Sequence, residues 1–353
     1  MNNHKILFIL KKSYNYSEHY SYKRSGLLNS ASFIEHYLHK ELYIDTKLVT
    51  VHDGNSIDKE VHHYKPTLVI IEAIWCPPYK LKELTKIYPH IKWIIRIHSK
   101  TPFLAHEGTA LNYIHAYNKI DNVFLSFNSF ETNEDYKKIG IRTIFLPNIY
   151  YHLKDESRKY VSEYVESYFN EKVKEHHAIH VGCFGAIRPM KNQLTQAIAA
   201  IRYADKNNKK LYFHINGTRI EQKGDGILKN LRNLFLNSKH ELIEWEWLEH
   251  KDFVYLVKKM TFGMQVSLSE SFNIVTADFV ENNIPIIVSK DIEWMPQLFT
   301  SNPLKINNIL FKLGMIMNFK KIVVRIAKRY LEIYNCNAKQ IWKEFLWIGF
   351  HDL

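Results

Sequence analysis

A short loop in the second half of the chain brings two cations to the start of a helix. Residues 185–192 read Gly-Ala-Ile-Arg-Pro-Met-Lys-Asn and follow a buried apolar run, so Arg188 and Lys191 lie between a strand and a helix. Backbone N–H groups at a helix start and neighbouring Arg or Lys side chains together form a ready site for a diphosphate. The alternative is an ordinary surface loop, because exposed Arg and Lys beside proline are commonplace.

A second polar segment carries two acidic residues eight positions apart. Residues 267–278 read Ser-Leu-Ser-Glu-Ser-Phe-Asn-Ile-Val-Thr-Ala-Asp, and a helix is expected from about Asn273. Glu270 then ends a strand, Asp278 lies within the helix, and the amides of residues 272–275 lack a helical partner. These amides could hold a phosphate while the carboxylates accept sugar hydroxyls. Alternatively, both acids serve only the helix start and its dipole.

The apolar pattern around these segments predicts parallel strands. The runs are continuous rather than alternating, as expected for strands buried on both faces of a sheet. In the first half they occupy residues 5–10, 47–51, 67–72, 91–97, 122–127 and 143–146, with helix-like segments such as 30–39 and 79–87 between them. In the second half they occupy residues 180–184, 210–215, 242–246, 263–268 and 285–288, with helices at 193–203, 227–236 and 252–259. Two doubly wound α/β domains are therefore expected, each binding ligands at the carboxyl ends of its strands.

Composition restricts the class of protein. The 353 residues are 46% hydrophobic and 24% charged, which is typical of a soluble globular protein of two domains. The net charge of +12 favours nucleic acid, an anionic membrane or phosphorylated ligands as partners, unless the surface is merely basic. Cys76 and Cys183 lie in apolar strand-like contexts and are expected to be buried thiols in a reducing cytoplasm. We expect neither a signal peptide nor a membrane-spanning segment, and the first βα turn lacks the glycine fingerprint of a dehydrogenase.

Together these motifs resemble the retaining GT-B glycosyltransferases of the glycogen-synthase and sucrose-synthase type. The acids of 267–278 resemble the E-x7-E motif of that family, and residues 185–192 resemble its phosphate-binding loop. Residues 96–99 (Arg-Ile-His-Ser) resemble its strand-then-histidine element, and residues 146–148 (Leu-Pro-Asn) resemble the strand end before its linker. The resemblance covers roughly residues 90–300.

The resemblance implies a GT-B fold, with two Rossmann-like domains facing a central cleft. The N-terminal acceptor domain would span residues 1–149, a linker 150–177, and the nucleotide-sugar donor domain 178–305. Helices over residues 306–353 would pack back toward the N-terminal domain. The family transfers sugar with retention of anomeric configuration and needs no metal. We therefore expect no cofactor, and a nucleotide sugar, a UDP-sugar in particular, as co-substrate.

The resemblance also assigns roles to single residues. The catalytic candidates are His98, Arg188, Lys191 and Glu270, with Asp278 at the ribose. The other donor-binding candidates are Gly185, Trp247, Leu248, Ser271, Phe272, Asn273, Ile274 and Val275. His98 could instead be a core histidine at a strand end, and Glu72 is expected to be structural or hydrogen-bonded. The chain departs from the family in having Asp278 for the second Glu, Ala186 for an Arg, and no glycine-rich first loop.

The acceptor is less well specified by the sequence. Acceptor-side candidates are Lys11, Lys12, Tyr14, Lys23 and Arg24 in the first loop, and Glu107, either as a base or as a helix-entry residue. The 70–110 region resembles phage transferases, which favours DNA bearing a hydroxymethylated pyrimidine, in the host cytoplasm, with the target base flipped out. The alternatives are a cell-surface glycan or lipid-linked acceptor, and a non-catalytic GT-B module that only binds sugar or nucleic acid.

Overall fold

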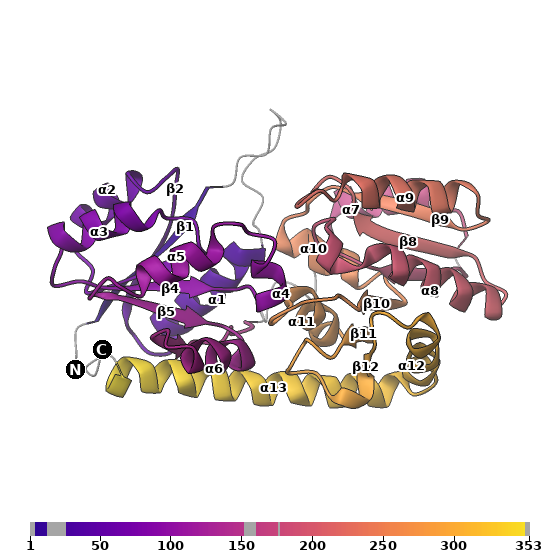
Figure 1. The fold of residues 1–353 in the computed structure, drawn as a ribbon. Helices are drawn as coiled ribbons and strands as arrows, with labels where there is room; N and C mark the ends of the chain where they lie inside the picture. Colours follow the sequence, from indigo (N-terminus) through magenta and orange to yellow (C-terminus); the bar gives the residue numbers. More distant parts are fainter. Residues whose placement is uncertain (1–3, 13–25, 152–159, 176, 350–353) are drawn as a thin grey trace. The chain divides into compact units, whose positions relative to one another are not determined.

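The computed structural model describes residues 4–12, 26–151, 160–175 and 177–349. The chain forms two compact units: residues 1–151 with 335–353, and residues 152–334. Each contains a six-stranded parallel sheet with helices on both faces (Figure 1). This confirms the predicted α/β class with two doubly wound sheets.

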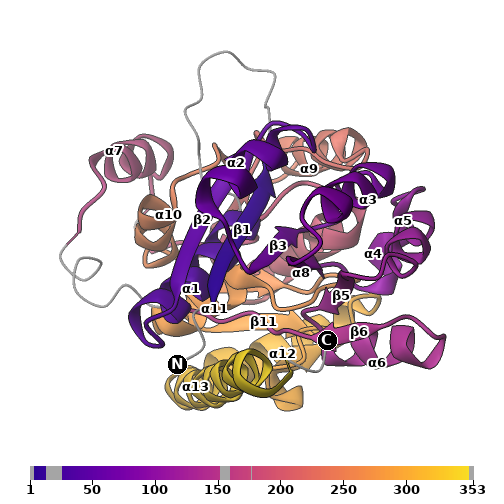
Figure 2. The same cartoon turned by 90° about the vertical axis from the view of Figure 1, so that its left-hand side faces the viewer.

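The first sheet has the strand order β2-β1-β3-β4-β5-β6, with parallel neighbours throughout. Its strands are β1 (Lys5–Lys11), β2 (Asp45–Val51), β3 (Leu68–Glu72), β4 (Lys92–Ile97), β5 (Val123–Phe127) and β6 (Thr143–Phe145). Its helices are α1 (Gly26–Lys40), α2 (Ser56–Tyr64), α3 (Pro78–Ile87), α4 (Thr101–Leu104), α5 (Ala110–Tyr117) and α6 (Phe130–Lys138). Helices α2, α3 and α5 pack on one face of the sheet, and α1 lies on the other (Figures 1 and 2).

The second sheet has the strand order β12-β11-β10-β7-β8-β9, again all parallel. Its strands are β7 (Ile179–Gly182), β8 (Leu211–Asn216), β9 (Glu241–Trp245), β10 (Phe262–Gln265), β11 (Ile286–Ser289) and β12 (Thr300–Ser301). The helices are α7 (Glu163–Lys172), α8 (Gln193–Lys206), α9 (Asp225–Leu236), α10 (His250–Val257), α11 (Ile274–Glu281), α12 (Ile306–Asn318) and α13 (Lys320–Glu344). Every predicted strand is present, and β12 is the one that the apolar pattern missed.

The last turns of α13 belong to the first unit. Asn335 exchanges two hydrogen bonds with the backbone of Tyr150: the Tyr150 N–H donates to Asn335 Oδ1 at 2.9 Å, and Asn335 Nδ2 donates to the Tyr150 carbonyl at 3.1 Å. The buried Trp342 donates its Nε1–H to the Pro147 carbonyl at 2.8 Å. Residues 335–342 therefore complete the core around β6.

Two glycines let α11 approach the central strands of the second sheet. A Cβ on Gly182 of β7 would lie 2.8 Å from the ring of Phe279, and a Cβ on Gly263 of β10 would lie 2.7 Å from the same ring. Real Cβ atoms do not come this close to other atoms, so the two glycines form a notch that receives the Phe279 ring. Phe184 also packs against Gly182, and Ile286 packs against Gly263. Because Phe279 belongs to α11, the packing of its ring in this notch fixes the position of the helix and of the polar loop before it.

A buried pair of histidines lies within the same sheet. Trp245 Nε1–H donates to His214 Nδ1 at 2.9 Å, and His214 Nε2 lies 3.1 Å from His180 Nδ1. The ring of Phe169 from α7 stacks on His214. Burial lowers the pKa of His180 to about 4 and holds the pKa of His214 well below its usual value. Both rings are therefore neutral at neutral pH.

We predict that this pair makes the fold sensitive to mild acid. An unfolded histidine binds a proton near pH 6.5, whereas folded His180 does so only near pH 4. Stability is therefore lost as pH falls between these values, because the unfolded state binds more protons. His180→Gln keeps an acceptor for His214 but does not titrate. When the pH falls from 7 to about 4.5, the free energy of unfolding measured with urea should decrease by about 2 kcal/mol less in this variant than in the wild type. Equal decreases would contradict the prediction.

Candidate functional site

The predicted cation and acid of the second unit meet where its two central strands end. Lys191 follows β7, Glu270 follows β10, and these strands are neighbours in the sheet. The next strand in sequence after β7, β8, lies on its other side, so ligands are expected to bind at this reversal of strand order. Lys191 Nζ lies 2.6 Å from Glu270 Oε1, and their side chains are only 10% and 8% exposed. The structure thus brings these two residues together.

The loop after β7 is shaped by a glycine in the left-handed region. Gly185 has a φ of 118°, and its N–H donates to Asn216 Oδ1 at 2.9 Å. A Cβ on Gly185 would lie 3.2 Å from Cε of Lys191, which folds back over the loop. A side chain at position 185 would strain the backbone and crowd the lysine. The glycine is therefore needed for the position of the cation.

Gln265, the last residue of β10, links the lysine to the start of α11. Its Oε1 accepts hydrogen bonds from Lys191 Nζ at 3.4 Å and from Asn273 Nδ2 at 2.8 Å. Asn273 has a φ of 56°, and its Oδ1 accepts the Thr276 N–H at 2.8 Å. This cap satisfies one first-turn amide of α11 and fixes the direction in which the helix starts.

The helix starts at Ile274, one residue later than predicted. The amides of Ile274 and Val275 therefore have no carbonyl one helical turn earlier to bond with. They lie in the segment between Glu270 and the body of α11. A phosphate group at this helix start would meet these amides as well as the positive end of the helix dipole.

Glu270 carries a charge although it is buried. Burial alone raises the pKa of a carboxyl group, but the charges of Lys191 and Arg188 hold the pKa of Glu270 below its usual value. Its backbone N–H donates to Asp291 Oδ2 at 3.1 Å, which ties the β10–α11 loop to the loop after β11. Glu270 is thus an anion in a fixed position, able to accept hydrogen bonds.

Arg188 is held by the loop after β8. Its Nη1 lies 3.3 Å from Glu221 Oε2, and Arg219 pairs with the same carboxylate at 2.7 Å. The Arg219 guanidinium stacks 4.3 Å from the ring centre of Trp247, which follows β9. The loops after β7, β8 and β9 are therefore connected, and Arg188 retains 21% exposure.

Asp278 has a different environment from the one predicted for a ribose-binding acid. Its side chain is fully buried, and Oδ1 lies 2.8 Å from Nε2 of His250 at the start of α10. His250 is 14% exposed, so it reaches the surface where Asp278 does not. The ribose contact of Asp278 stays a prediction, and His250 becomes a candidate for that contact.

The remaining donor-side candidates surround these residues. Phe272 is buried, stacks on Tyr334, and its carbonyl accepts the Trp294 Nε1–H at 2.7 Å. Leu248 is buried beside Trp247, and Ser271 is half-buried. Phe272 therefore supports the loop from behind rather than presenting a polar group.

The first unit carries a buried polar network at the carboxyl ends of its strands. Arg96 of β4 is fully buried; its Nη1 lies 3.1 Å from Glu72 Oε2, and its Nη2 donates to Asn148 Oδ1 at 2.5 Å. Asn128 Nδ2 also donates to Asn148, at 3.3 Å. His98 Nε2 contacts Glu72 Oε2. Consecutive strands β3 to β6 thus each contribute to one cluster that holds His98.

Burial and the charge of Arg96 determine the protonation states of Glu72 and His98. Burial raises the pKa of Glu72, but Arg96 and His98 outweigh it and hold the pKa below its usual value. Burial, and then the charge of Arg96, lower the pKa of His98. Glu72 is therefore anionic and His98 neutral near pH 7. The His98 side chain is 15% exposed, so the ring is anchored but still reachable.

The acceptor-side candidates are less completely placed. Lys11 ends β1 and is exposed, and the Lys12 N–H donates to the Val51 carbonyl at 2.7 Å. Glu107 is half-buried between α4 and α5. The predicted Tyr14, Lys23 and Arg24 lie outside the described residues.

Sequence reasoning missed several residues that hold the site. These are Asn216 and Gln265, the last residues of β8 and β10. Asn148 belongs to the Leu-Pro-Asn motif of residues 146–148, but the sequence assigned it no role in the site. A polar side chain that ends a buried apolar run was the available signal, because strand ends in these sheets face ligands. Nothing local indicated His250, whose partner Asp278 is on another helix.

The described residues contain neither a candidate metal site nor a candidate membrane-spanning helix. No group of three or more His, Cys, Asp or Glu side chains in it could hold a metal ion. No helix in it is long and apolar enough to cross a membrane.

Comparison with known proteins identifies the fold. No protein-family model matches the sequence, and no curated protein matches it. Among solved structures, HepE of Anabaena in complex with UDP and glucose is 14% identical, with a TM-score of 0.65 over 97% of this chain and 99% of that chain. A glycosyltransferase from Rickettsia africae is 14% identical, with a TM-score of 0.66 over 99% and 100%. Sucrose-phosphate synthase from Thermosynechococcus elongatus is 11% identical, with a TM-score of 0.67 over 99% of both chains. The chain has the GT-B fold that it shares with these glycosyltransferases.

We predict that the first unit tolerates the buried charges of Glu72 and Arg96 only as a pair. Glu72→Gln leaves the buried guanidinium without a counter-charge and should lower the free energy of unfolding by about 3–5 kcal/mol. Glu72→Met combined with Arg96→Met removes both charges and should lose less than the sum of the single changes, as measured by urea unfolding in a double-mutant cycle.

The partly exposed pair of Lys47 and Glu60, with Nζ and Oε2 3.1 Å apart, is the matched control in the same unit. Its Glu60→Gln variant should cost less than about 1 kcal/mol. A Glu72→Gln cost as small as that of the control would refute the role given to the buried pair.

Proposed function

We propose that this chain is a glycosyltransferase that takes a sugar from a UDP-sugar donor and transfers it to a hydroxyl acceptor with retention of configuration. Two findings support the proposal. The chain shares its fold with glycosyltransferases, among them one whose structure contains UDP and glucose. Its own residues place cations, a carboxylate and helix-start amides at the reversal point of the second sheet.

The pair of Lys191 and Glu270 carries the proposal. A nearly buried ion pair is stable only while both charges keep partners. A nucleotide sugar supplies a partner for each: a diphosphate oxygen for Lys191, and sugar hydroxyls for Glu270. Binding would therefore replace the contact between Lys191 and Glu270 with contacts from each residue to the ligand, and neither charge would be left without a partner.

The same residues suit the chemical step. Breaking the bond between the anomeric carbon and the phosphate oxygen leaves negative charge on the nucleoside diphosphate. Lys191, Arg188 and the amides of Ile274 and Val275 would stabilise that charge, and such preorganised groups are commonly the largest contribution to catalysis. The neutral His98 of the first unit stays the proposed contact to the donor sugar. No side chain is assigned as a covalent nucleophile.

We predict that variants of the pair separate recognition of phosphate from recognition of sugar. Lys191→Met should weaken UDP and UDP-glucose alike, by about 10- to 100-fold, because both ligands lose a charged partner. Glu270→Gln should weaken UDP-glucose but not UDP, because it releases Lys191 for the phosphate. Isothermal titration calorimetry with both ligands on both variants measures these differences.

A second ion pair of the same unit serves as the control. Lys210 Nζ lies 2.9 Å from Glu241 Oε1 at the amino ends of β8 and β9, away from the candidate site at the carboxyl ends of the strands. Lys210→Met and Glu241→Gln should leave both affinities unchanged. If the wild type binds no nucleotide sugar, or if Glu270→Gln weakens UDP as strongly as UDP-glucose, the proposed donor site is wrong.

Two acceptor classes are proposed, each from its own observation. The net charge of +12 and the cations at the end of β1 support DNA bearing a hydroxymethylated pyrimidine. Exposed aliphatic side chains beside cations on α13, such as Ile322 and Ile333, support a lipid-linked or cell-surface glycan. A DNA duplex provides little apolar surface for such aliphatic side chains, so they favour the lipid-linked or cell-surface acceptor.

We predict that transfer assays with UDP-glucose separate these acceptors. A DNA acceptor requires transfer that depends on the hydroxymethyl group, together with duplex affinity that falls steeply between low and moderate salt. A lipid-linked acceptor requires transfer in vesicles that contain a polyprenyl-phosphate glycan. The anomeric proton coupling of the product, measured by NMR, reports retention. Absence of both transfer and donor hydrolysis, in the wild type as in Glu270→Ala, would favour the non-catalytic binding module.

A further inference from the structure

Helix α13 exposes a row of large apolar side chains. Phe319 precedes the helix, and Ile322, Ile326, Tyr330 and Ile333 follow at steps of three or four residues. Residues at this spacing share one side of a helix. Their exposed fractions run from 36% to 57%. At 1.5 Å per residue the row is about 21 Å long.

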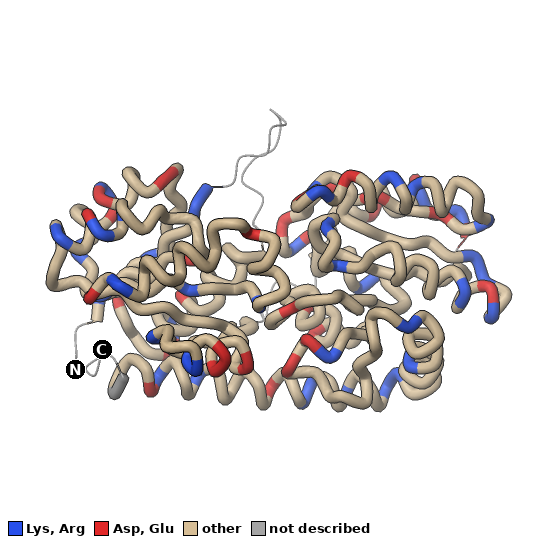
Figure 3. Tube along the Cα trace, in the orientation of Figure 1, with Lys and Arg blue, Asp and Glu red and all other residues tan. Residues whose placement is uncertain are grey.

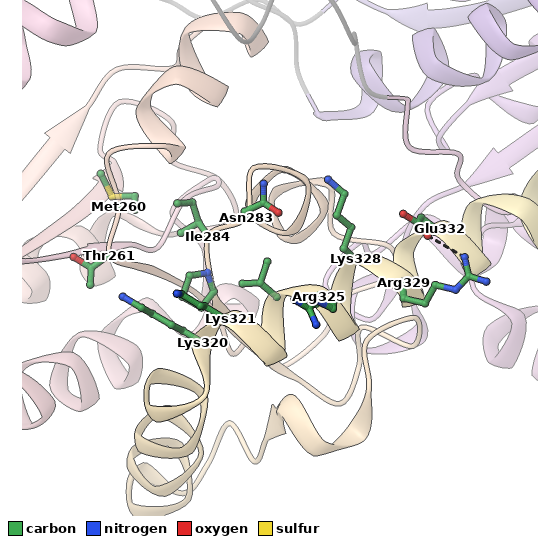
Figure 4. A pocket seen from close by; sticks show the side chains of 12 residues that line it. Met260, Thr261, Asn283, Ile284, Lys320, Lys321, Arg325, Lys328, Arg329 and Glu332 are labelled. Atoms are coloured by element: carbon green, nitrogen blue, oxygen red, sulfur yellow. Dashed lines mark hydrogen bonds and ion pairs between the residues drawn. The ribbon is translucent and has the colours of Figure 1, made fainter.

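A cationic groove of about 740 Å³ runs beside this row. Its other wall consists of residues 260–261 and 283–285 (Figure 4). Glu332 is the one acid among the described residues that line it. The cations that α13 contributes are Lys320, Lys321, Arg325, Lys328 and Arg329. With about 100° per residue, positions 321, 325, 328 and 329 occupy the arc next to the apolar row.

Much of this positive charge has no acidic partner. Lys328 lies 3.3 Å from Glu281 in a half-buried pair. Arg329 lies 3.1 Å from Glu332 in an exposed pair, and pairs of the exposed kind are weak. Lys320, Lys321 and Arg325 form no ion pair within the described residues. In Figure 3, Lys and Arg recur along the helix that Figure 1 labels α13. The groove therefore has room and charge for an anionic partner.

The groove is separate from the candidate donor site. Thr261 precedes β10 and Pro285 precedes β11, so the groove lies at the amino ends of these strands. Lys191 and Glu270 lie at the carboxyl ends of the central strands, on the opposite edge of the same sheet. The cations of the groove are therefore not needed to explain binding of a nucleotide sugar.

We propose that the α13 face, defined as the apolar row with the cationic groove beside it, docks on an anionic phospholipid bilayer. The cations contact lipid phosphates, and the apolar row enters the boundary between headgroups and acyl chains. A helix surface with aliphatic and aromatic side chains flanked by Lys and Arg binds such interfaces through both interactions together. The proposal does not depend on the activity of the second sheet.

The combination of charge and apolarity selects this partner over two others. A nucleic acid provides phosphates for the cations, but its phosphate backbone would also face Ile322 and Ile333, and it does not bury apolar side chains. A second copy of the chain could cover the apolar rows, but it would bring Lys321 and Arg325 of each copy to the same interface, where like charges are unfavourable. A bilayer with anionic lipids satisfies both sets of side chains.

Co-sedimentation of the full chain with vesicles tests the proposal. The wild type should bind vesicles of phosphatidylcholine with about one-third phosphatidylglycerol, and should not bind vesicles of pure phosphatidylcholine. The variant Lys320→Gln/Lys321→Gln/Arg325→Gln should lose roughly 100-fold in affinity, because each cation near an anionic surface contributes about fivefold. Ile322→Ser/Ile333→Ser should bind at least tenfold more weakly at unchanged net charge.

Matched variants elsewhere in the second unit control for charge and apolarity. Lys206→Gln/Lys209→Gln/Lys229→Gln removes the same charge from exposed positions, and Val161→Ser/Leu236→Ser removes exposed apolar side chains. Both should bind vesicles like the wild type. UDP binding and the thermal unfolding midpoint, measured on every variant, show that each is folded and that donor binding is a separate property.

Three outcomes would overturn the proposal. In the first, the control cation variant loses as much affinity as the α13 variant, which would show that net charge alone acts. In the second, duplex DNA binding is sensitive to Lys320, Lys321 and Arg325 while vesicles are not bound. In the third, the wild type is a dimer in light scattering, Ile322→Ser/Ile333→Ser is a monomer, and neither binds vesicles.

Discussion

Lys191 and Glu270 depend on each other, because either charge alone would be costly at so buried a position. Their side chains are 10% and 8% exposed and their charged atoms lie 2.6 Å apart. Gly185 makes space for the lysine, and the notch that receives Phe279 positions the helix after the glutamate. The first unit follows the same rule with a buried arginine. In both sheets, charges that the core could not tolerate alone are compensated at the carboxyl ends of the strands.

The fold could be predicted because parallel strands leave a clear trace in the chain. Strands such as β3 and β11 are covered on both faces, so their residues are apolar without alternation. Their limits were predicted within a few residues. β12 was missed because it consists of only two residues, Thr300 and Ser301, which cannot form a recognisable apolar run. The division of α13 between the units depends on contacts over long sequence separations, which no local pattern encodes.

The site could be predicted as a set of residues but not as an arrangement. Lys191 and Glu270 each follow an apolar run, and that placed them at strand ends. Their pairing depends on β7 lying beside β10, a relation between segments about 80 residues apart. The same applies to Asp278, whose carboxylate contacts His250 on a different helix. Burial of this carboxylate is a tertiary property, so the family pattern alone could not reveal it.

The division of the chain between the units has a consequence for biosynthesis. The first unit lacks Trp342, and the bonds from Asn335 to the Tyr150 backbone, until residues 335–342 have been made. The second unit, residues 152–334, is continuous and can fold as soon as it leaves the ribosome. At 5–20 residues per second, the amino-terminal sheet waits roughly 10–40 s for its final helix. During that interval Trp342 does not yet lie against Arg96, whose guanidinium is 5.7 Å from its ring in the folded protein, so this part of the core is exposed to chaperones and to aggregation.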